Sequence, residues 1–477
     1  MPSRKKEVSV AARGRRQPVE SKKLLERVVI RMLQRMATAL TRWSTRWVPD
    51  AWVIAVLLSV VTFIIALIFT KSTIYQLVQY WGRGFWVLLS FAMQMSLIIM
   101  TGYILAVSPP MSRLLNKLAE LPKSPAQAIA LMAVFSMVSA WINWGFSIVG
   151  SAVFTKFIAR KQKGVDYRLL VSAAYLGLGT FWHAGLSASA PLLVATPKHF
   201  MEAKLGIIPV TETIFHPFNL VMCLVILVAM TVFTPMLHPK KEDVVEADPA
   251  SLGEGEGFVA PAKPANPTPG QWIEHSPWVN YIVGIAGIVW LFWHFSTNGP
   301  QMTLDVVNFG FLMIGILLHG TPASLLKAAE EAGTFIWGVV LQFPFYAGIF
   351  GIIQYSKLES VIAGWFTSIA TKDTYALIVF WYSGVLNYFV PSGGSKWAIE
   401  APYVIEAGRQ LGVPNALSVL AYAWGDMATD IIQPFWAIPL LGVAKLGFKD
   451  IMGYCIILFL VYMIITSIGF YLAPMFF

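Results

Sequence analysis

Long apolar stretches alternate with short polar segments along most of the chain. An α-helix rises about 1.5 Å per residue, so roughly 20 apolar residues are needed to cross a hydrocarbon core of about 30 Å. Stretches near this length predict transmembrane helices at 51–69, 84–106, 215–236, 277–296, 303–319, 334–354 and 451–474. The pattern therefore predicts an all-α polytopic membrane protein.

Four further apolar regions are interrupted by polar, glycine or proline residues. In a bilayer, non-helical backbone is tolerated only where protein or a water-filled cavity surrounds it. We interpret two of the regions as re-entrant helical hairpins, 125–158 and 375–407, and two as broken transmembrane helices, 168–197 and 416–445. The interruptions fall near Asn143, between Gly179 and Pro191, at Pro391, and between Gly425 and Pro434.

The clearest interruption follows the apolar run 375–390. This run of about 16 residues would reach only roughly 24 Å as a helix. It ends at Pro391, four small residues follow, and a helical pattern restarts at Lys396. Such a break with hydroxyl side chains is a candidate substrate or ion site. An ordinary proline–glycine kink between packed helices would give the same pattern.

The two halves of the chain resemble each other at a nearly constant offset. The sequence around Asn143 recurs around Asn387, and Pro191 has a counterpart in Pro434. The order of the elements and the loop charges predict two inverted repeats. Each repeat would contain one re-entrant helical hairpin and one broken transmembrane helix.

This pattern divides the chain into six segments. We expect a disordered basic N-terminus and then a basic amphipathic helix, which lies on the anionic membrane surface or packs on the protein's own cytoplasmic face. The segments are the disordered N-terminus (1–20), the amphipathic interfacial helix (21–47), the first transmembrane repeat (48–238), a polar cytoplasmic linker (239–276), a connecting transmembrane helix (277–302) and the second transmembrane repeat (303–477).

The distribution of charged residues predicts the orientation of the chain in the membrane. The chain is 57% hydrophobic with a net charge of +10, and its Lys and Arg residues crowd the N-terminus and the loops that we assign to the cytoplasm. This distribution indicates membrane topology with a cytoplasmic N-terminus, and no nucleic-acid partner. No cleavable signal peptide is apparent, so the first span would act as an uncleaved insertion signal.

Cysteine content and missing motifs narrow the function classes. Cys223 and Cys455 both lie in apolar runs, so we expect neither a disulfide framework nor a metal cluster. The chain lacks G-x-x-x-x-G-K-[ST], H-E-x-x-H and G-x-S-x-G. These absences argue against an ATP-driven pump and weakly against an intramembrane hydrolase. We expect no enzyme activity, and no cofactor apart from a coupling ion.

Two hairpin tips that meet near the middle of the membrane would form a substrate site. Free N–H groups at the start of the helix after the break suit a carboxylate, and Asn side chains with free carbonyls suit a cation such as Na⁺. The asparagines could instead form interhelical hydrogen bonds, and Lys396 could pair with Glu400. The predicted substrate-binding residues are Asn143, Ser147, Asn387, Ser392, Gly393, Gly394, Ser395 and Lys396.

The broken helices carry the candidate ion-coupling residues. Asp426 and Asp430 lie four residues apart within an apolar span, where a carboxylate indicates a proton relay or a cation ligand. His183 and Ser187 occupy the corresponding place in the first half. A histidine can titrate near neutral pH, although a lone histidine in a helix is more often a hydrogen-bonded structural residue.

At these interruptions the sequence resembles the bacterial short-chain fatty acid transporter family. The resemblance extends from about Trp47 to the C-terminus. It implies an inner-membrane permease for short monocarboxylates such as butyrate or acetoacetate, and kinship with ion transporters that use paired hairpins and elevator-like movement. The stretches that carry it are Gly84–Met95, Ile142–Phe146, Val340–Gly348, Val390–Gly394, Gln433–Pro439 and Ile451–Cys455.

We therefore predict a secondary active transporter that takes up short-chain monocarboxylates across the bacterial inner membrane, coupled to H⁺ or Na⁺. Elevator-like movement would favour a homodimer in the lipid bilayer. The alternatives are a dicarboxylate or lactate permease, a passive anion channel, and a membrane-embedded acyl-modifying enzyme that uses His183 with Asp426 or Asp430.

Overall fold

The computed structural model describes residues 46–47, 49, 51–248, 252 and 258–477. The predicted disordered N-terminus (1–20) lies outside the described residues. So does the predicted interfacial helix (21–47), apart from its last two residues. Every regular element in the described residues is a helix.

Several helices in the described part of the chain could cross a membrane. Eight of them are long and apolar enough by length and composition. This confirms the prediction of an all-α polytopic membrane protein. The eight are Trp52–Phe69, Leu89–Val107, Pro125–Ile142, Tyr167–Leu193, Pro217–Met236, Trp278–Asn298, Trp337–Tyr355 and Phe448–Met475.

The first half of the chain folds into helices α2 to α11. The segment between the predicted spans 51–69 and 84–106 contains a helix of its own, α3, which begins with a capping box at Thr73. The bounds are α2 (Ala51–Phe69), α3 (Ile74–Gly84), α4 (Leu89–Val107), α5 (Pro109–Leu118), α6 (Pro125–Ile142), α7 (Trp144–Lys161), α8 (Tyr167–Thr180), η1 (Trp182–Ala184), α9 (Ser189–Leu193), α10 (Glu202–Leu205), η2 (Val210–Glu212) and α11 (Pro217–Met236).

The described part of the linker contains two short helices, and the second half again consists of helices joined by short segments. Two segments that lie between predicted spans, 320–333 and 355–374, contain the helices α16 and α18. The bounds are η3 (Lys241–Asp243), α13 (Pro269–Glu274), α14 (Trp278–Asn298), α15 (Leu304–His319), α16 (Pro322–Gly333), α17 (Trp337–Tyr355), α18 (Leu358–Ile369), α19 (Tyr375–Phe389), α20 (Gly393–Gln410), α21 (Asn415–Ala428), η4 (Asp430–Ile432), α22 (Ile438–Ala444), α23 (Phe448–Leu472) and η5 (Ala473–Met475).

The predicted interruptions are confirmed, and those of the two hairpins have a local cause. Between α6 and α7, Asn143 adopts extended backbone, and its side chain accepts a hydrogen bond from the Phe146 N–H at 2.9 Å. This cap replaces a helical bond and starts a new helix. Between α19 and α20, Pro391 supplies no N–H, and α20 restarts at Gly393. The inverted relation of the two halves stays a prediction.

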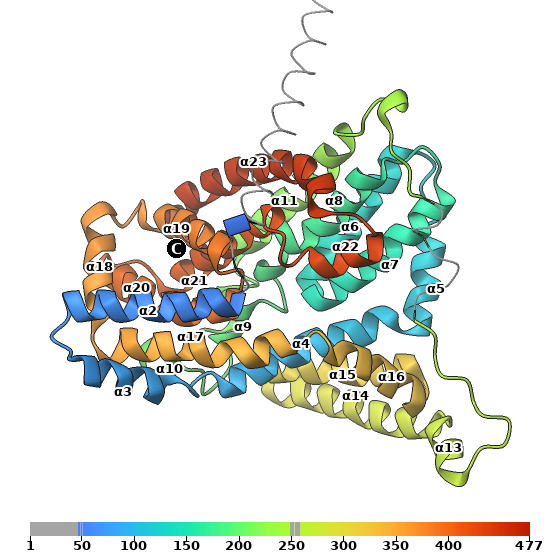
Figure 1. Cartoon of the computed structure of the whole chain (residues 1–477), viewed down its shortest axis with the longest axis horizontal. Coiled ribbons are helices and arrows are strands. Elements are labelled where there is room, and N and C mark those ends of the chain that lie inside the picture. The colour runs from blue at the N-terminus through green and yellow to red at the C-terminus, as the bar shows by residue number, and fades with distance from the viewer. Residues whose placement is uncertain (1–45, 48, 50, 249–251, 253–257) are drawn as a thin grey trace, which may run out of the picture.

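The helices form two groups that lie side by side. In one group α2 and α3 pack on α17, while α14 packs on α15 and α15 on α4 (Figure 1). In the other, α6 packs on α8 and α19 on α21. Because α4 contacts α7 and α17 contacts α20, the two hairpins lie against the long helices of the first group.

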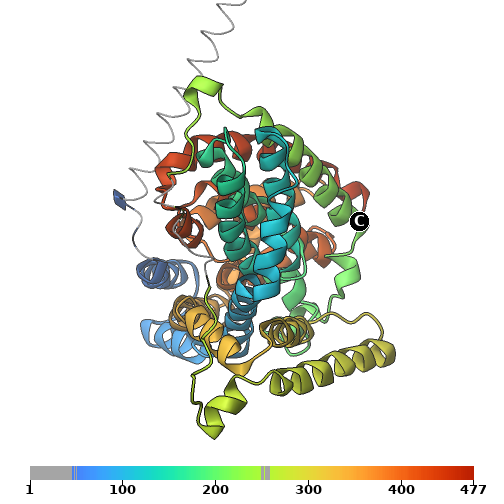
Figure 2. The same ribbon diagram turned by 90° about the vertical axis from the view of Figure 1, so that its right-hand side faces the viewer.

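Burial separates the peripheral helices from the central ones. Only 11% of the apolar window of α2 and 17% of that of α14 are buried, and α14 lies at the edge of the molecule in Figure 2. The broken segment Tyr167–Leu193 is 94% buried in its window. An apolar helix with little buried surface suits a lipid-facing position, whereas the broken helix lies in the protein interior, where its free backbone groups can find partners.

The contact between α6 and α8 yields a prediction. A Cβ atom on Gly177 would lie 2.0 Å from the Ser136 backbone oxygen, whereas nothing lies within 4 Å of a Cβ on Gly82 in α3. We expect Gly177→Ala to force α8 away from α6 and to lower the thermal unfolding midpoint in detergent by several degrees. The matched control Gly82→Ala should leave the midpoint unchanged or raise it, because alanine favours a helix over glycine. Equal midpoints for the two variants would contradict the close approach.

Candidate functional site

A charged cluster lies in the interior, just beyond the tip of the second hairpin. Lys396 and Glu400 are one turn apart on α20, Asp426 is on α21, and all three are 0% exposed. The Lys396 Nζ lies 3.0 Å from Glu400 Oε1 and 3.1 Å from Asp426 Oδ1. It also donates to the Ser383 backbone oxygen at 3.0 Å. Protein carboxylates therefore neutralise Lys396, which is the ion-pair alternative that the sequence left open.

His183 extends this cluster to the first broken helix. Its Nδ1 lies 2.7 Å from Asp426 Oδ2, and the Ala190 N–H donates to its Nε2 at 3.2 Å. A ring nitrogen that accepts a hydrogen bond carries no proton. This arrangement assigns a neutral His183 whose Nδ1–H donates to Asp426, so His183 orients the carboxylate and adds no charge.

Asp430 is held by donors from the other interrupted segments. The Asn387 Nδ2 donates to Asp430 Oδ1 at 2.8 Å, and the Trp182 Nε1–H donates to Oδ2 at 3.0 Å. The Tyr175 hydroxyl donates to the Asp430 backbone oxygen at 2.9 Å. The Asp430 carboxylate thus joins the second hairpin to both broken helices. The helix breaks bring these polar groups within hydrogen-bond distance.

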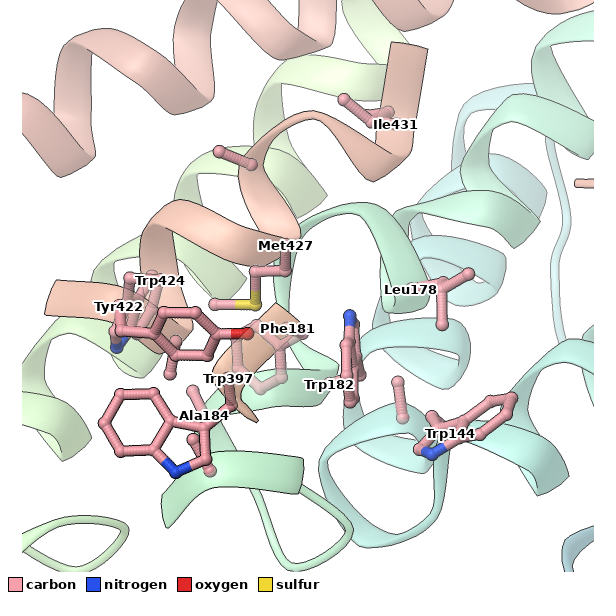
Figure 3. Close-up of a cluster of buried hydrophobic side chains, with 14 of the residues drawn as sticks. Trp144, Leu178, Phe181, Trp182, Ala184, Trp397, Tyr422, Trp424, Met427 and Ile431 are labelled. Carbon is pink, nitrogen blue, oxygen red and sulfur yellow. The ribbon is translucent and has the colours of Figure 1, made fainter. Parts of the chain in front are cut away.

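Aromatic side chains enclose the charged cluster. Figure 3 shows Trp144, Trp182 and Tyr422, from α7, η1 and α21, in one buried group. The Lys396 Nζ lies 4.4 Å from the centroid of the Tyr422 ring, within cation–π distance. The Tyr422 hydroxyl donates to the Gly393 oxygen at 2.6 Å. Tyr422 therefore connects the charged cluster to the hairpin tip.

An apolar cavity of about 260 Å³ lies between the two hairpin tips and the long helices. Trp144 of the first tip, Ser392 of the second, Trp436 after the second broken helix and Gln342 of α17 line it. Trp144 and Trp436 meet edge to face with their ring centroids 5.2 Å apart. Apolar walls with a few polar groups are typical of a pocket for a small amphipathic molecule.

The predicted residues of the first half have hydrogen-bond partners within the protein. The Ser147 hydroxyl donates to the Ser136 oxygen at 2.7 Å, and the Ser187 hydroxyl accepts from the Trp144 N–H at 2.9 Å. Asn143 caps α7. These bonds hold the first hairpin and the first broken helix together. A direct role of these residues in binding stays a prediction.

The predicted residues of the second tip lie between the cavity and the charged cluster. Ser392 lines the cavity, and its hydroxyl is 2.8 Å from that of Ser395. A Cβ atom on Gly393 would lie 2.6 Å from Asp426 Oδ2, so only glycine fits there. A Cβ atom on Gly394 would lie 2.9 Å from the Phe91 ring. The tip therefore rests directly on the charged cluster.

Sequence reasoning gave no role to the aromatic residues. Trp144, Trp182 and Trp436 all stand within or beside the interruptions, and that position was the available signal. A large aromatic side chain beside a helix break can cover the free backbone groups of the break and the cavity next to it. Glu400 was recognised only as a partner for Lys396.

Comparison with known sequences identifies relatives over nearly the whole chain. The model of the family described as short chain fatty acid transporter matches residues 32–473. A protein of Escherichia coli K12, provisionally assigned as a short-chain fatty acid transporter, is 42% identical over 438 residues, which cover 92% of this chain and 99% of that protein. A Haemophilus influenzae protein with the same provisional assignment is 39% identical over 431 residues, or 89% and 96% of the two chains.

Two solved structures share the fold. The Alcanivorax borkumensis YdaH transporter, described as having an unusual topology, superposes with a TM-score of 0.52 at 16% identity over 89% of this chain and 98% of its own. Neisseria gonorrhoeae MtrF, described with a class of antimetabolite efflux pumps, gives a TM-score of 0.58 at 14% identity over 92% and 97%. Both are membrane transporters, and at this identity the likeness concerns the fold alone.

The Asn387–Asp430 contact can be tested by exchanging its partners. Asp430→Asn replaces one carboxylate oxygen by an N–H₂ group, which must then face the N–H donor of Asn387 or of Trp182. A buried polar group left without a partner costs about 1–3 kcal/mol. We expect a lower thermal unfolding midpoint in detergent for this variant. The double variant Asn387→Asp with Asp430→Asn restores an amide–carboxylate pair and should recover part of the loss. A double variant that is less stable than the sum of the two single variants would contradict the assigned contact.

Proposed function

Because the chain belongs to the short chain fatty acid transporter family, we propose that it is a secondary active transporter for short-chain monocarboxylates such as butyrate or acetoacetate. It takes them up across the bacterial inner membrane, with its N-terminus in the cytoplasm. The observation that carries the proposal is the cavity between the two hairpin tips, which adjoins a buried cluster of opposite charges.

The substrate carboxylate binds at the start of α20. The first N–H groups of a helix have no partner within it, and no side chain caps α20. The helix dipole adds a partial positive charge there. Ser392, which precedes the first helical residue, lines the cavity, so a carboxylate in the cavity reaches both its hydroxyl and the helix terminus. Trp144 and Trp436 then enclose the alkyl chain.

The character of the cavity wall favours one carboxylate over two. Among the described residues that line it, none is Lys or Arg. A dicarboxylate would leave its second charge among apolar side chains, and burial of an unpaired charge is costly. This supports a monocarboxylate as substrate and makes a dicarboxylate permease the weaker alternative.

The charged cluster supports coupling to a cation. Together with Asp430, which interacts electrostatically with Asp426, it contains three carboxyl groups but one ammonium, that of Lys396. If all were ionised, two negative charges would remain uncompensated in the interior, where an unpaired ion costs several kcal/mol. A coupling H⁺ or Na⁺ removes part of this excess. Movement of the hairpins relative to the long helices then alternates access, and such a movement favours a homodimer.

Transport in proteoliposomes tests the proposal directly. With an inward H⁺ gradient or an inward Na⁺ gradient, labelled butyrate and acetoacetate should accumulate above equilibrium under one of the two conditions. Collapse of that gradient by an ionophore should abolish the accumulation. Equilibration without accumulation would instead indicate a channel, and competition by succinate would indicate a dicarboxylate permease. A chemically altered product would indicate an enzyme.

Two variants at the second tip should lose uptake while the protein still inserts. Ser392→Ala removes a hydroxyl next to the carboxylate, and a hydrogen bond to a charged group contributes about 1.5–3 kcal/mol. The KM for butyrate should therefore rise at least about tenfold. Gly393→Leu places a side chain against Asp426 and should abolish uptake. Uptake at the wild-type rate by both variants would contradict the assignment of the substrate site to this tip.

Chain-length selectivity tests the cavity itself. Ile148→Ala enlarges the cavity, whereas Ile158→Ala removes the same atoms from a buried position of α7 that does not line it. Each buried CH₂ contributes about 0.8 kcal/mol, so the ratio of kcat/KM for hexanoate to that for butyrate should rise roughly tenfold in Ile148→Ala. The ratio should stay at the wild-type value in Ile158→Ala. An unchanged ratio in both variants would place the alkyl chain elsewhere.

A further inference from the structure

The three carboxyl groups of the charged cluster differ in how their oxygens are matched by donors. Asp426 Oδ2 lies 2.7 Å from His183 Nδ1, and its Oδ1 forms no hydrogen bond but lies 3.1 Å from the Lys396 ammonium as an ion pair. Both oxygens of Asp430 accept N–H hydrogen bonds. Glu400 has its Oε1 3.0 Å from Lys396, but its Oε2 is buried and accepts no hydrogen bond.

This difference indicates which carboxyl holds a proton. A carboxylate only accepts hydrogen bonds, so an ionised acid is stable in the interior where donors surround both of its oxygens. A bare, buried and charged oxygen is far less favourable than a neutral hydroxyl at the same place. Asp426 fits the ionised form because one oxygen faces His183 and the other faces the Lys396 ammonium. Asp430 fits it because both of its oxygens accept hydrogen bonds. Glu400 Oε2 faces neither a donor nor a cation, so Glu400 fits the protonated form.

Lys396 cannot stabilise an additional negative charge on Glu400 without giving up another partner. An ammonium has three protons, and Lys396 already serves the Ser383 backbone oxygen and hydroxyl, Glu400 Oε1 and Asp426 Oδ1. With Asp426 ionised, the charge of Lys396 is already balanced. Ionised Glu400 would therefore add a further negative charge to that of Asp430, which Lys396 does not balance.

The other groups around Glu400 bring no positive charge. The titratable groups that interact electrostatically with it, besides Lys396 and Asp426, are tyrosines: Tyr403 on its own helix, Tyr375 and Tyr382 on α19, and Tyr422 on α21. Their hydroxyls are engaged elsewhere. Tyr375 donates to the Val404 oxygen, Tyr382 and Tyr403 bond each other, and Tyr422 donates to the Gly393 oxygen.

Glu400 is also connected to the proposed substrate site. Lys396 lies between them: its ammonium contacts Glu400, and it lies over the ring of Tyr422. Tyr422 in turn donates to Gly393 at the hairpin tip. Loss of the proton from Glu400 would strengthen its hold on Lys396 and weaken that of Asp426, against which Gly393 is packed. The charge on Glu400 can thus alter the tip that binds substrate.

We propose that Glu400 carries the coupling proton, so that uptake is driven by H⁺ and not by Na⁺. Glu400 takes one proton from water on the side where substrate enters and releases it on the other side, and no other bond forms or breaks. This inference rests on the function proposed above.

The variant Glu400→Gln separates exchange from net transport. Glutamine keeps the shape and neutrality of the protonated acid but cannot release a proton. Exchange of internal labelled butyrate for external butyrate should stay within about twofold of wild type, whereas accumulation driven by an inward H⁺ gradient should fall at least about tenfold. The matched control is Glu359→Gln, which removes another buried glutamate paired with a lysine, Lys204 at 2.5 Å. It should retain both activities.

Three results would overturn the proposal. One is H⁺-driven accumulation at the wild-type level in Glu400→Gln. Another is loss of exchange together with accumulation, which would make Glu400 a structural partner of Lys396. The third is accumulation in wild type under a Na⁺ gradient without a H⁺ gradient. If wild type neither accumulates nor exchanges butyrate, the proposed function fails, and the state of Glu400 is then decided by spectroscopy.

Infrared spectroscopy of wild type needs neither substrate nor the variant. Purified protein at neutral pH should show the carbonyl stretch of a protonated, buried carboxylic acid. Incorporation of ¹³C-carboxyl glutamate should shift this band, and ¹³C-carboxyl aspartate should leave it in place. Absence of the band, or a shift with labelled aspartate alone, would show that Glu400 is not protonated. This test holds even if Glu400→Gln fails to fold.

Discussion

The structure depends on how charge is accommodated in a membrane interior. A charged side chain placed there must be paired, because neither lipid nor packed apolar side chains solvate it. Lys396, Glu400 and Asp426 are completely buried, and the Lys396 ammonium lies within 3.1 Å of both carboxyl groups. Their pairing requires α20 and α21 to meet at this depth. The second hairpin tip lies at the start of the same helix, about one turn before Lys396, so its position follows from that contact.

The helix breaks serve the same constraint. A continuous helix satisfies its own backbone and offers a neighbour only side chains, whereas a break leaves side chains and backbone groups free to bond across the interior. Asp430 meets Asn387 and Trp182 in this way, and His183 meets Asp426. The breaks therefore lie where the most polar contacts gather, and the surrounding segment is the most buried of the candidate spans.

The apolar cavity and the charged cluster are separate but adjoining. Ser392 lines the cavity, and the next residue, Gly393, packs on Asp426 and receives the Tyr422 hydroxyl at its oxygen. An apolar wall suits an alkyl chain, and a charged interior suits a cation. Because a single tip touches both, a change of charge in the cluster and occupancy of the cavity act on the same few backbone atoms, which is what coupled transport requires.

Sequence alone determined the helical spans, the interruptions and the family, because the length needed to cross a bilayer and the effects of Asn143 and Pro391 on the backbone are local. It also placed Lys396 and Glu400 on one helical face. Tertiary structure decided the rest. His183 and Asp426 are 243 residues apart in the chain, and nothing in their spacing states that they meet. Which carboxyl lacks a donor likewise depends on where neighbouring helices direct their N–H groups, and only packing in three dimensions sets that direction.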